Sequence, residues 1–324
     1  MELNKKGIFF TFAAIALSII IILSFNVYTD YRLNDQMGPI EIRIDTMNNF
    51  IKDLENDIGN AIFIAGFRSL LSLEDYMMDH DEFFNAVDTP TLANAFDEVF
   101  RLGTIQYGTG TEKMLLMNNN TFLNWTDRMK LQSTRTNIKL EFNIDSVTIS
   151  QSDPWAVDLT VRLDIDVKDE KNTASWTINN KDYTKKINIT SLTGVKKFVD
   201  PLYLVNNNGL VNNTITITTV PDFSSSANLN THLINSYYIE HSDAPSYLMR
   251  FENNLGSSSQ GIESLVNSQK LIDKGVTTYD RSAVDYIYYG SGITTNCKIV
   301  DFESLDWFKL DSSHLGFYGA TCIP

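Results

Sequence analysis

The 324-residue chain contains few of the residues that usually build reactive sites, with only two cysteines and four histidines. So few thiols and imidazoles leave little material for a metal centre of cysteine and histidine, and we expect no metal site and no cofactor. Basic residues are also scarce, with 26 Lys and Arg against 40 Asp and Glu and a net charge of −14. Because an acidic surface repels phosphate backbones, a nucleic-acid partner is not expected.

Motifs of known catalytic chemistry are missing as well. The chain has no G-x-S-x-G elbow, since YYGSGI places Ser291 between adjacent glycines, and it has no G-K-[ST] phosphate loop. In the acidic runs MDHDEFF, around His80, and IEHSD, around His241, neighbouring side chains point to different sides of the chain, which favours solvated loops over metal sites. A thiol nucleophile would have only His314 near it. We therefore expect that the protein is not an enzyme.

Another acidic group follows the alternating segment after Trp155. Asp164, Asp166, Asp169 and Glu170 are oxygen donors of the kind that Ca²⁺ prefers, but no glycine-containing calcium loop follows them. A solvated sheet face, with charge pairing to Arg162 and Lys168, explains these carboxylates better.

One long apolar run stands near the start of the sequence. Residues 8–25 carry no charge, and continuation to Tyr28 gives a helix about 31 Å long, which matches a hydrocarbon core of about 30 Å. A cleaved secretory signal would need small residues after the run, where the chain has Val27 and Tyr28. The sequence therefore predicts a transmembrane helix over 8–28. Lys5 and Lys6 precede it, which predicts a cytoplasmic N-terminus and an extracellular remainder.

The residues KKGIFF at the head of this run resemble the class III (prepilin) signal of type IV pilin-like proteins, which are common in archaea. The resemblance implies cleavage by a prepilin peptidase after Gly7, with Ile8 as the new N-terminus. It also implies a helix that anchors the protein in the lipid bilayer and, in true pilins, packs against copies of itself or against other pilin-like subunits. The chain departs from the family pattern at Phe12, where many members carry a glutamate, and this departure favours an anchored monomer.

Further resemblance lies in the last third of the chain. Four blocks there are similar to uncharacterised archaeal surface proteins with pilin-like N-termini: VDPLYLVN at 199–206, APSYLMRFEN at 244–253, GIESLVN at 261–267 and DRSAVDYIYY at 280–289. Membership would imply an exported, membrane-tethered protein.

Helical periodicity follows the apolar run. Apolar residues recur at steps of three and four and predict a helix over about 40–72, with a kink or a break between it and the membrane helix at Gly38 and Pro39. A second helix is predicted over 90–102, with Thr89 as its N-cap and Gly103 as its end. Its expected buried face consists of Leu92, Phe96, Val99 and Phe100.

A period of two replaces the helical period near residue 133. WAVDLTVRLDIDVKD alternates apolar and polar residues, which is typical of a strand with one buried face. Similar segments at 137–150, 174–179, 185–192 and 213–220 predict an antiparallel sheet or a β-sandwich, and VDYIYY at 284–289 predicts a further strand.

These patterns predict an α+β protein in five parts. They are a basic leader at 1–7, a transmembrane or pilin-like helix at 8–28, a helical stalk or subdomain at 29–132, an antiparallel β head at 133–220, and a mixed α/β C-terminal region at 221–324 that packs on the β domain.

Two features favour an extracellular location. N-x-S/T sequons occur at Asn119, Asn124, Asn188 and Asn212, although an unmodified asparagine in a loop is at least as common at any one of them. Cys297 and Cys322 could form a disulfide worth about 3 kcal/mol in an oxidising compartment, or could be two unrelated buried thiols; the bridge is favoured.

Three functional classes remain open. The first is a pilin-like, membrane-anchored surface protein, either a structural subunit or a minor component of a type IV pilus-like assembly. The second is a monomeric signal-anchored ectodomain for adhesion or ligand binding. The third, least favoured, is an extracellular hydrolase. The first two share the location predicted above: a single-pass protein of the cell membrane with its bulk outside.

Overall fold

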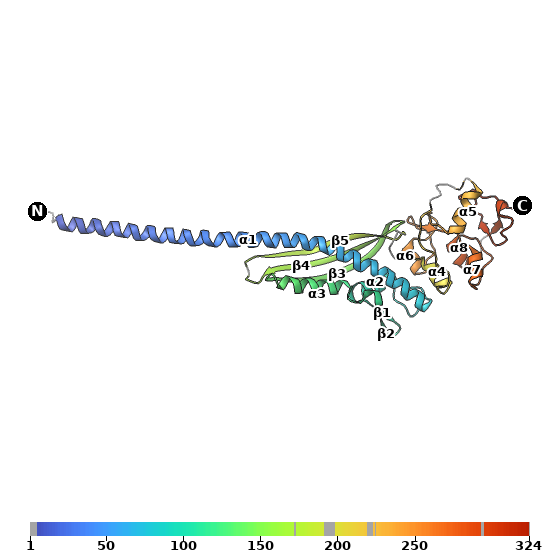
Figure 1. Ribbon diagram of the computed structural model, residues 1–324, viewed down its shortest axis with the longest axis horizontal. Helices are drawn as coiled ribbons and strands as arrows, with labels where there is room; N and C mark the ends of the chain where they lie inside the picture. The colour runs from blue at the N-terminus through green and yellow to red at the C-terminus, as the bar shows by residue number, and fades with distance from the viewer. Residues whose placement is uncertain are drawn as a thin grey trace.

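Figure 1 shows the computed structural model of the chain, which describes residues 5–171, 173–190, 198–218, 223, 225–292 and 295–323. The side chains of 5–14 and 24–39 lie outside this description. The architecture is mixed α+β with antiparallel sheets, as the sequence predicts. It consists of a long N-terminal helix, a three-stranded sheet beside its second half, and a C-terminal region of short elements at the far end (Figure 1).

Helix α1 (Lys5–His80) has 76 residues, which corresponds to a length of about 114 Å. Its first half projects away from the rest of the chain (Figure 1). Of the two alternatives predicted at Gly38 and Pro39, the break is wrong, because the helix passes through both residues, and the kink stays a prediction. Proline removes one backbone hydrogen bond, and the turns on both sides continue the helix.

The predicted membrane segment at 8–28 falls largely on residues whose side chains lie outside the description, as do Gly7 and Ile8. Within the described part of the chain, no helix combines the length and the apolar character needed to cross a membrane.

The second half of α1 packs into the protein. Met47, Leu54, Ile58 and Ile62 form a buried stripe at helical spacing. From Ser69 onward nearly every side chain up to Met77 is buried, so this segment is enclosed on nearly all sides before the exposed last turn of the helix. The helix predicted over 40–72 is therefore confirmed in type, and it is a part of a longer one.

The main sheet consists of β3 (Ile138–Asp153), β4 (Ala156–Asp169) and β5 (Ser175–Asn188), paired antiparallel in the order β3-β4-β5. The alternation predicted for the central strand is confirmed, because its apolar side chains are all 0% exposed: Val157, Leu159, Val161, Leu163, Ile165 and Val167. Helices α1 and α3 (Phe122–Thr134) lie against the sheet (Figure 1). These helices take the place of a second sheet, so the sandwich alternative is wrong for the described residues.

Close contact between α1 and the sheet depends on one glycine. A Cβ atom added to Gly66 would lie 2.3 Å from Cδ2 of Leu159 and 3.0 Å from Cδ1 of Ile187. Any larger residue would require the side chains of Leu159 and Ile187 to move.

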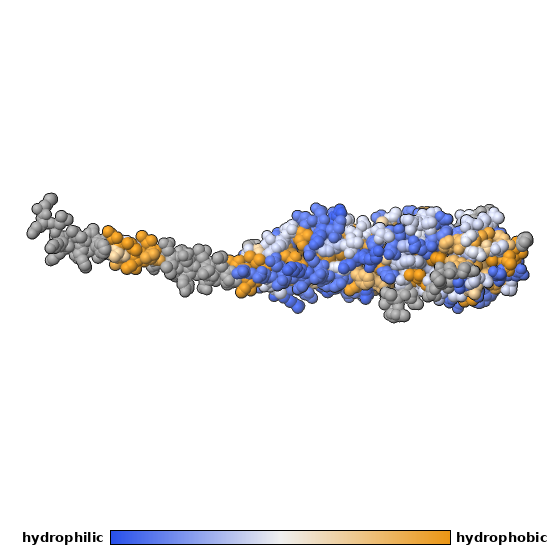
Figure 2. Space-filling model, turned by 90° about the horizontal axis from the view of Figure 1, so that it is seen from above, coloured by the Kyte–Doolittle hydropathy of each residue, from blue (hydrophilic) through white to orange (hydrophobic). Residues whose placement is uncertain are grey.

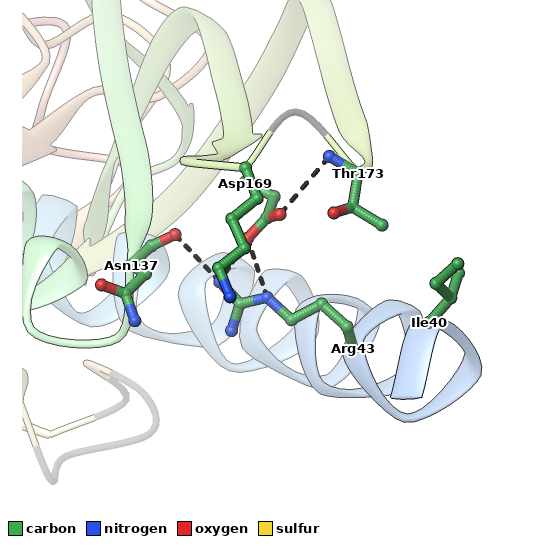
Figure 3. Close-up of a pocket in the computed structure, with 6 residues that line it drawn as sticks. Ile40, Arg43, Asn137, Asp169 and Thr173 are labelled. Atoms are coloured by element: carbon green, nitrogen blue, oxygen red, sulfur yellow. Dashed lines mark hydrogen bonds and ion pairs between the residues drawn. The ribbon is translucent and has the colours of Figure 1, made fainter. Parts of the chain in front are cut away.

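At the opposite end of the sheet, Arg43 joins α1 to the β3–β4 region (Figure 3). Its Nε donates to Oδ1 of Asp169 at 2.9 Å, and its Nη2 donates to the carbonyl oxygens of Thr136 and Asn137, each at 2.9 Å. These groups line a small surface pocket that also includes Ile40 and Thr173. These contacts hold α1 at the point where it meets the packed part of the chain, from residue 40 onward, which we call the head.

Helix α2 (Leu92–Leu102) is close to the predicted one. Its N-cap is Thr91 instead of Thr89, and the Thr91 side chain accepts a hydrogen bond from the backbone N–H of Asn94. Gly103 ends the helix in the left-handed conformation, with φ of 72°. The predicted buried face is confirmed. After the helix come β1 (Thr104–Tyr107), β2 (Gly110–Lys113) and the 3-10 turn η1 (Leu115–Met117).

The C-terminal region consists of short elements, as expected for a mixed region. They are α4 (Pro201–Asn206), α5 (Ser226–Asn235), β6 (Ile239–Glu240), α6 (Tyr247–Phe251), β7 (Ile262–Glu263), α7 (Ser268–Asp273), α8 (Asp285–Tyr289), β8 (Asn296–Lys298), η2 (Val300–Phe302) and β9 (Lys309–Asp311).

Two strand predictions in the last third of the chain are wrong. VDYIYY forms the helix α8, because an apolar run this short has no period that separates strand from helix. The described part of the segment at 213–220 forms only isolated bridges, at Thr214 and Ile217.

The predicted disulfide is confirmed. Cys297 in β8 is bonded to Cys322, with 5.6 Å between their Cα atoms. The bridge closes a loop that contains β9 and the turn after it. Both cysteines are therefore unavailable as thiol nucleophiles.

Candidate functional site

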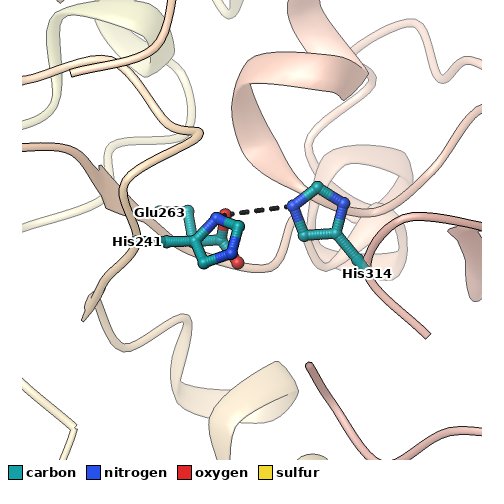
Figure 4. Close-up of side chains that lie close together, drawn as sticks. All are labelled: His241, Glu263 and His314. Atoms are coloured by element: carbon teal, nitrogen blue, oxygen red, sulfur yellow. Dashed lines mark ion pairs between the residues drawn. The ribbon is translucent and has the colours of Figure 1, made fainter. Parts of the chain in front are cut away.

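Three segments of the C-terminal region meet at a cluster of two histidines and a glutamate (Figure 4). Glu263 ends β7, and His241 follows β6, which pairs with β7. His314 lies in the turn after β9, inside the disulfide loop. The candidate ligand atoms of the three side chains all lie within 4.8 Å of one another. We call these three residues the His–Glu–His cluster.

The approach of β6 to β7 depends on Gly261. The backbone N–H of His241 donates to the carbonyl oxygen of Gly261 at 3.0 Å. A Cβ atom at Gly261 would lie 2.2 Å from the carbonyl oxygen of Ala244 and 2.3 Å from that of His241. Glycine is therefore needed to bring His241 beside Glu263.

The glutamate is at the centre of the cluster. Its Oε2 atom lies 3.0 Å from Nδ1 of His241 and 3.3 Å from Nε2 of His314. The two imidazoles thus approach one carboxylate oxygen from separate chain segments (Figure 4). Glu263 is 0% and His314 2% exposed, whereas the His241 side chain is 16% exposed and faces the surface.

Other side chains hold the cluster in place. Oδ1 of Asp311 lies 2.8 Å from Nδ1 of His314, so this carboxylate fixes the ring, and Ser282 donates to Oδ2 of Asp311 at 2.7 Å. The Tyr318 hydroxyl donates to Oε1 of Glu263 at 2.6 Å. These contacts leave Nε2 of His314 and Oε2 of Glu263 directed toward the centre of the cluster.

Two atoms of the cluster lack a hydrogen-bond partner. Oε2 of Glu263 and Nδ1 of His241 are buried, and neither makes a hydrogen bond of acceptable geometry within the described part of the chain, although they lie close together. Oε2 of Glu263 therefore has ion-pair contacts with two imidazoles but no hydrogen bond of good geometry.

The electrostatic balance of the cluster favours charged forms in the absence of any bound cation. Burial alone would lower the pKa of His314, but the carboxylates of Asp311 and Glu263 raise it to about 10. Burial would likewise raise the pKa of Glu263, but the two imidazoles and the Tyr318 hydroxyl lower it to about 2. The same carboxylate raises the pKa of His241.

A fourth histidine lies close by without joining the cluster. His232 on α5 is 0% exposed, and neither of its ring nitrogens has a hydrogen-bond partner among the described residues. Its ring packs against Phe223, with 5.3 Å between the centroids. Burial lowers the pKa of His232 to about 4, so the ring is neutral at pH 7.

A second buried polar cluster surrounds Arg250, which is 0% exposed. Its Nη1 donates to Oδ2 of Asp200 at 2.5 Å and to Oδ2 of Asp285 at 2.9 Å. The remaining carboxylate oxygens accept backbone hydrogen bonds, from Leu202 to Asp200 at 2.9 Å and from Tyr286 to Asp285 at 2.6 Å. Every carboxylate oxygen of this Arg250 cluster therefore has a donor.

The two acidic runs, MDHDEFF around His80 and IEHSD around His241, lie in different surroundings. His80 lies 3.3 Å from Glu112 on the surface, and no third ligand joins them among the described residues. His241 of the run IEHSD, in contrast, belongs to the His–Glu–His cluster. Its partners come from later segments and not from the adjacent acids, so the expected solvated loop is wrong for His241 itself.

The carboxylates around β4 do not form a cation site either. Asp164 accepts hydrogen bonds from Asn143 at 3.2 Å and from the backbone of Asn180 at 2.7 Å. Asp169 pairs with Arg43, and Arg162 pairs with Asp182 of β5. Asp164 and Asp166 lie on the expected polar face of the sheet, whereas Asp169 is buried, and the partners of these carboxylates come from neighbouring elements in place of the expected Arg162 and Lys168.

The four sequons lie in different settings. Asn119, Asn188 and Asn212 are exposed. Asn124 is half-buried in the first turn of α3, where it forms a capping box with Thr121. Three of the asparagines are thus accessible to a modifying enzyme in the folded chain, and their glycosylation stays a prediction.

Comparison of the chain with protein-family models, with curated proteins and with solved structures gives no match. Its function must therefore be inferred from its own residues.

Proposed function

We propose that this protein is a pilin-like, membrane-anchored surface protein whose long helix holds an extracellular head. One observation carries the proposal: in the projecting half of α1, the described side chains at 15–23 expose an apolar surface. The described side chains there are each between 47% and 66% exposed: Ile15, Leu17, Ile19, Ile20, Ile21, Ile22 and Leu23. Full burial of each such side chain is worth roughly 1.5–3 kcal/mol, so this segment needs an apolar environment.

The distribution of these side chains favours lipid as that environment. Residues 19–23 are five consecutive large apolar residues, which cover more than one helical turn. The coloured part of the projecting helix is accordingly hydrophobic in Figure 2, whereas the middle of the head is mostly hydrophilic. An apolar surface on all sides fits a bilayer better than a single partner helix, which would need only one stripe.

The head has properties that support an extracellular location. The disulfide between Cys297 and Cys322 is typical of oxidising compartments. Exposed sequons at Asn119, Asn188 and Asn212 are compatible with the same location. A cleavage by prepilin peptidase between Gly7 and Ile8 belongs to this proposal, as does later packing of the anchor helix against copies of itself.

A monomeric anchored ectodomain is the second candidate. Phe12 favours it, because pilins that polymerise commonly carry a glutamate at this mature position. The two candidates share the anchor and differ in processing and assembly.

The mature N-terminal residue tests the proposal. We expect the protein purified from its native membrane to begin at Ile8 in a mass spectrum. A chain that retains Met1 would support the monomeric anchored ectodomain instead.

Membrane retention tests the anchor independently of cleavage. Ile20→Lys combined with Ile22→Asp should release the protein into the soluble fraction, because charges in a bilayer-spanning helix are costly. Ile272→Lys is the matched control, since Ile272 is an exposed isoleucine of the head at 50%. Release of the unsubstituted protein by simple washing would overturn the anchored reading.

A further inference from the structure

We propose that His241, Glu263 and His314 bind one divalent transition-metal ion, with Zn²⁺ as the ion that fits best. The inference rests on the C-terminal region alone and does not depend on the anchor or its processing.

The donor atoms select the class of metal. Two imidazole nitrogens and one carboxylate oxygen suit Zn²⁺ and similar first-row ions. Ca²⁺ and Mg²⁺ prefer sites built of oxygen ligands, so they are not expected here.

Two of the three ligand-atom spacings also fit, and the third, between the two imidazole nitrogens, is at most 4.8 Å. In a tetrahedral zinc site with metal–ligand distances of about 2.1 Å, neighbouring ligand atoms lie about 3.4 Å apart. The two measured edges are 3.0 Å from His241 Nδ1 to Glu263 Oε2, and 3.3 Å from His314 Nε2 to the same oxygen.

Supporting contacts of the kind found around metal ligands are already in place. Asp311 holds Nδ1 of His314, which directs Nε2 inward, and Tyr318 holds the other oxygen of Glu263. The Tyr286 hydroxyl lies 3.2 Å from Nε2 of His314, and a bound ion would replace this contact.

The unpartnered atoms are the second, independent observation. Oε2 of Glu263 and Nδ1 of His241 are buried, close together and without directed hydrogen bonds among the described residues. A cation between them would satisfy both. His241 also provides access, because its side chain is 16% exposed while those of the other two ligands are almost fully buried.

The alternative is a metal-free cluster in which both imidazole rings are protonated. Two imidazolium rings can share the Glu263 carboxylate as ion pairs with no metal, and the raised pKa of His314 is compatible with that state. Metal binding then requires release of protons from the rings.

Zinc titration of the full chain tests the proposal. The protein is solubilised in detergent, stripped with a chelator, desalted and titrated with Zn²⁺ by calorimetry. We expect one ion per chain, no binding of Mg²⁺, and tetrahedral absorption bands when Co²⁺ is used.

Variants connect the binding to the three residues. His241→Asn, at the partly exposed position, should weaken Zn²⁺ binding at least 100-fold, and Asp311→Asn should weaken it about 10- to 100-fold. His80→Asn is the matched control, because His80 also lies beside a glutamate but has no third ligand. Circular dichroism confirms that each variant is folded.

Two results would overturn the proposal. The first is a folded unsubstituted chain that takes up no stoichiometric Zn²⁺, which would leave the cluster as ion pairs only. The second is Zn²⁺ binding that His241→Asn leaves unchanged.

Discussion

The two buried polar clusters of the C-terminal region are built from similar charges and differ in how those charges are satisfied. In the Arg250 cluster, the guanidinium and backbone N–H groups reach all carboxylate oxygens of Asp200 and Asp285. In the His–Glu–His cluster, Oε2 of Glu263 has two imidazoles nearby and no directed hydrogen bond within the described chain.

This difference separates a structural role from a binding role. An unexposed ion cluster in which every carboxylate oxygen has a donor holds neighbouring segments together, and its one unpartnered atom among the described residues, Nε of Arg250, is a donor that cannot bind a cation. A cluster with unpartnered ligand atoms and one exposed member can accept an ion. Substitutions in the Arg250 cluster and in the His–Glu–His cluster test this difference.

The largest effect is expected at Arg250. Arg250→Met should lower the free energy of unfolding by about 3–5 kcal/mol, because it leaves two carboxylates buried without their cation. Denaturant unfolding followed by circular dichroism measures the change. Arg162→Met is the control: it removes an ion pair with Asp182 on the exposed sheet face and should have a much smaller effect. Equal effects of the two substitutions would contradict the assigned structural role of the Arg250 cluster.

Removal of the disulfide should affect the two clusters unequally. The double variant Cys297→Ala, Cys322→Ala should lose about 3 kcal/mol of stability. It should also weaken Zn²⁺ binding, because Asp311, His314 and Tyr318 all lie in the loop that the disulfide closes. Calorimetric titration of the reduced and oxidised unsubstituted protein provides the same comparison. Unchanged Zn²⁺ affinity in both experiments would show that the loop is held by other contacts.

A pH dependence of stability is expected from His232. Its pKa in the folded protein is lowered by burial to about 4, and Glu263 is the charged group that acts on it in the opposite direction. Between the unfolded value of about 6.5 and this folded value, the unfolded chain binds a proton that the folded chain does not. Stability should therefore fall as the pH is lowered through this window, by at most about 3 kcal/mol from this residue.

The variant His232→Phe isolates this contribution. The difference in unfolding free energy between pH 7 and pH 4.5 should be smaller in the variant than in the unsubstituted protein. Parallel pH profiles for the two chains would refute the neutral buried state of His232.

The smallest effect is expected at the cap of α2. Thr91→Ala should cost about 1 kcal/mol, because the Thr91 side chain accepts the N–H of Asn94. Thr89→Ala tests the position that the sequence favoured, and thermal unfolding measures both. The Thr89 hydroxyl donates to the carbonyl oxygen of Phe83 at 3.1 Å and accepts the N–H of Ala86 at 2.9 Å. A larger loss of stability at Thr89 than at Thr91 would therefore show that these loop contacts matter more than the helix cap.

Much of the fold could be predicted where the sequence repeats a clear period. The alternation of β4 and the stripe of α1 from Met47 to Ile62 appear directly in the residues, because each reflects one buried face. The strand predicted at VDYIYY is a helix, because a six-residue segment with one charged residue carries no such period. The continuation of α1 through Pro39 depends on the helical turns on both sides of the proline. The rule that proline interrupts a helix considers the proline alone and not these turns.

The candidate site could not be predicted for a different reason. His241, Glu263 and His314 are far apart in the sequence, and the pairing of β6 with β7 and the disulfide loop bring them together. The adjacent acids Glu240 and Asp243 do not belong to the cluster that contains His241. The small number of histidines predicted no metal site, so the sequence held no signal for the meeting of two of them at this glutamate.

Metal content of the protein as isolated tests the central comparison most directly. The full chain and the variants His241→Asn and His80→Asn are purified from the same membranes without added metal and analysed by elemental mass spectrometry. We predict close to one transition-metal ion per chain in the unsubstituted protein and in His80→Asn, and close to none in His241→Asn. An unsubstituted protein free of such metals that also fails to bind added Zn²⁺ would contradict the account and place both clusters in the same structural role.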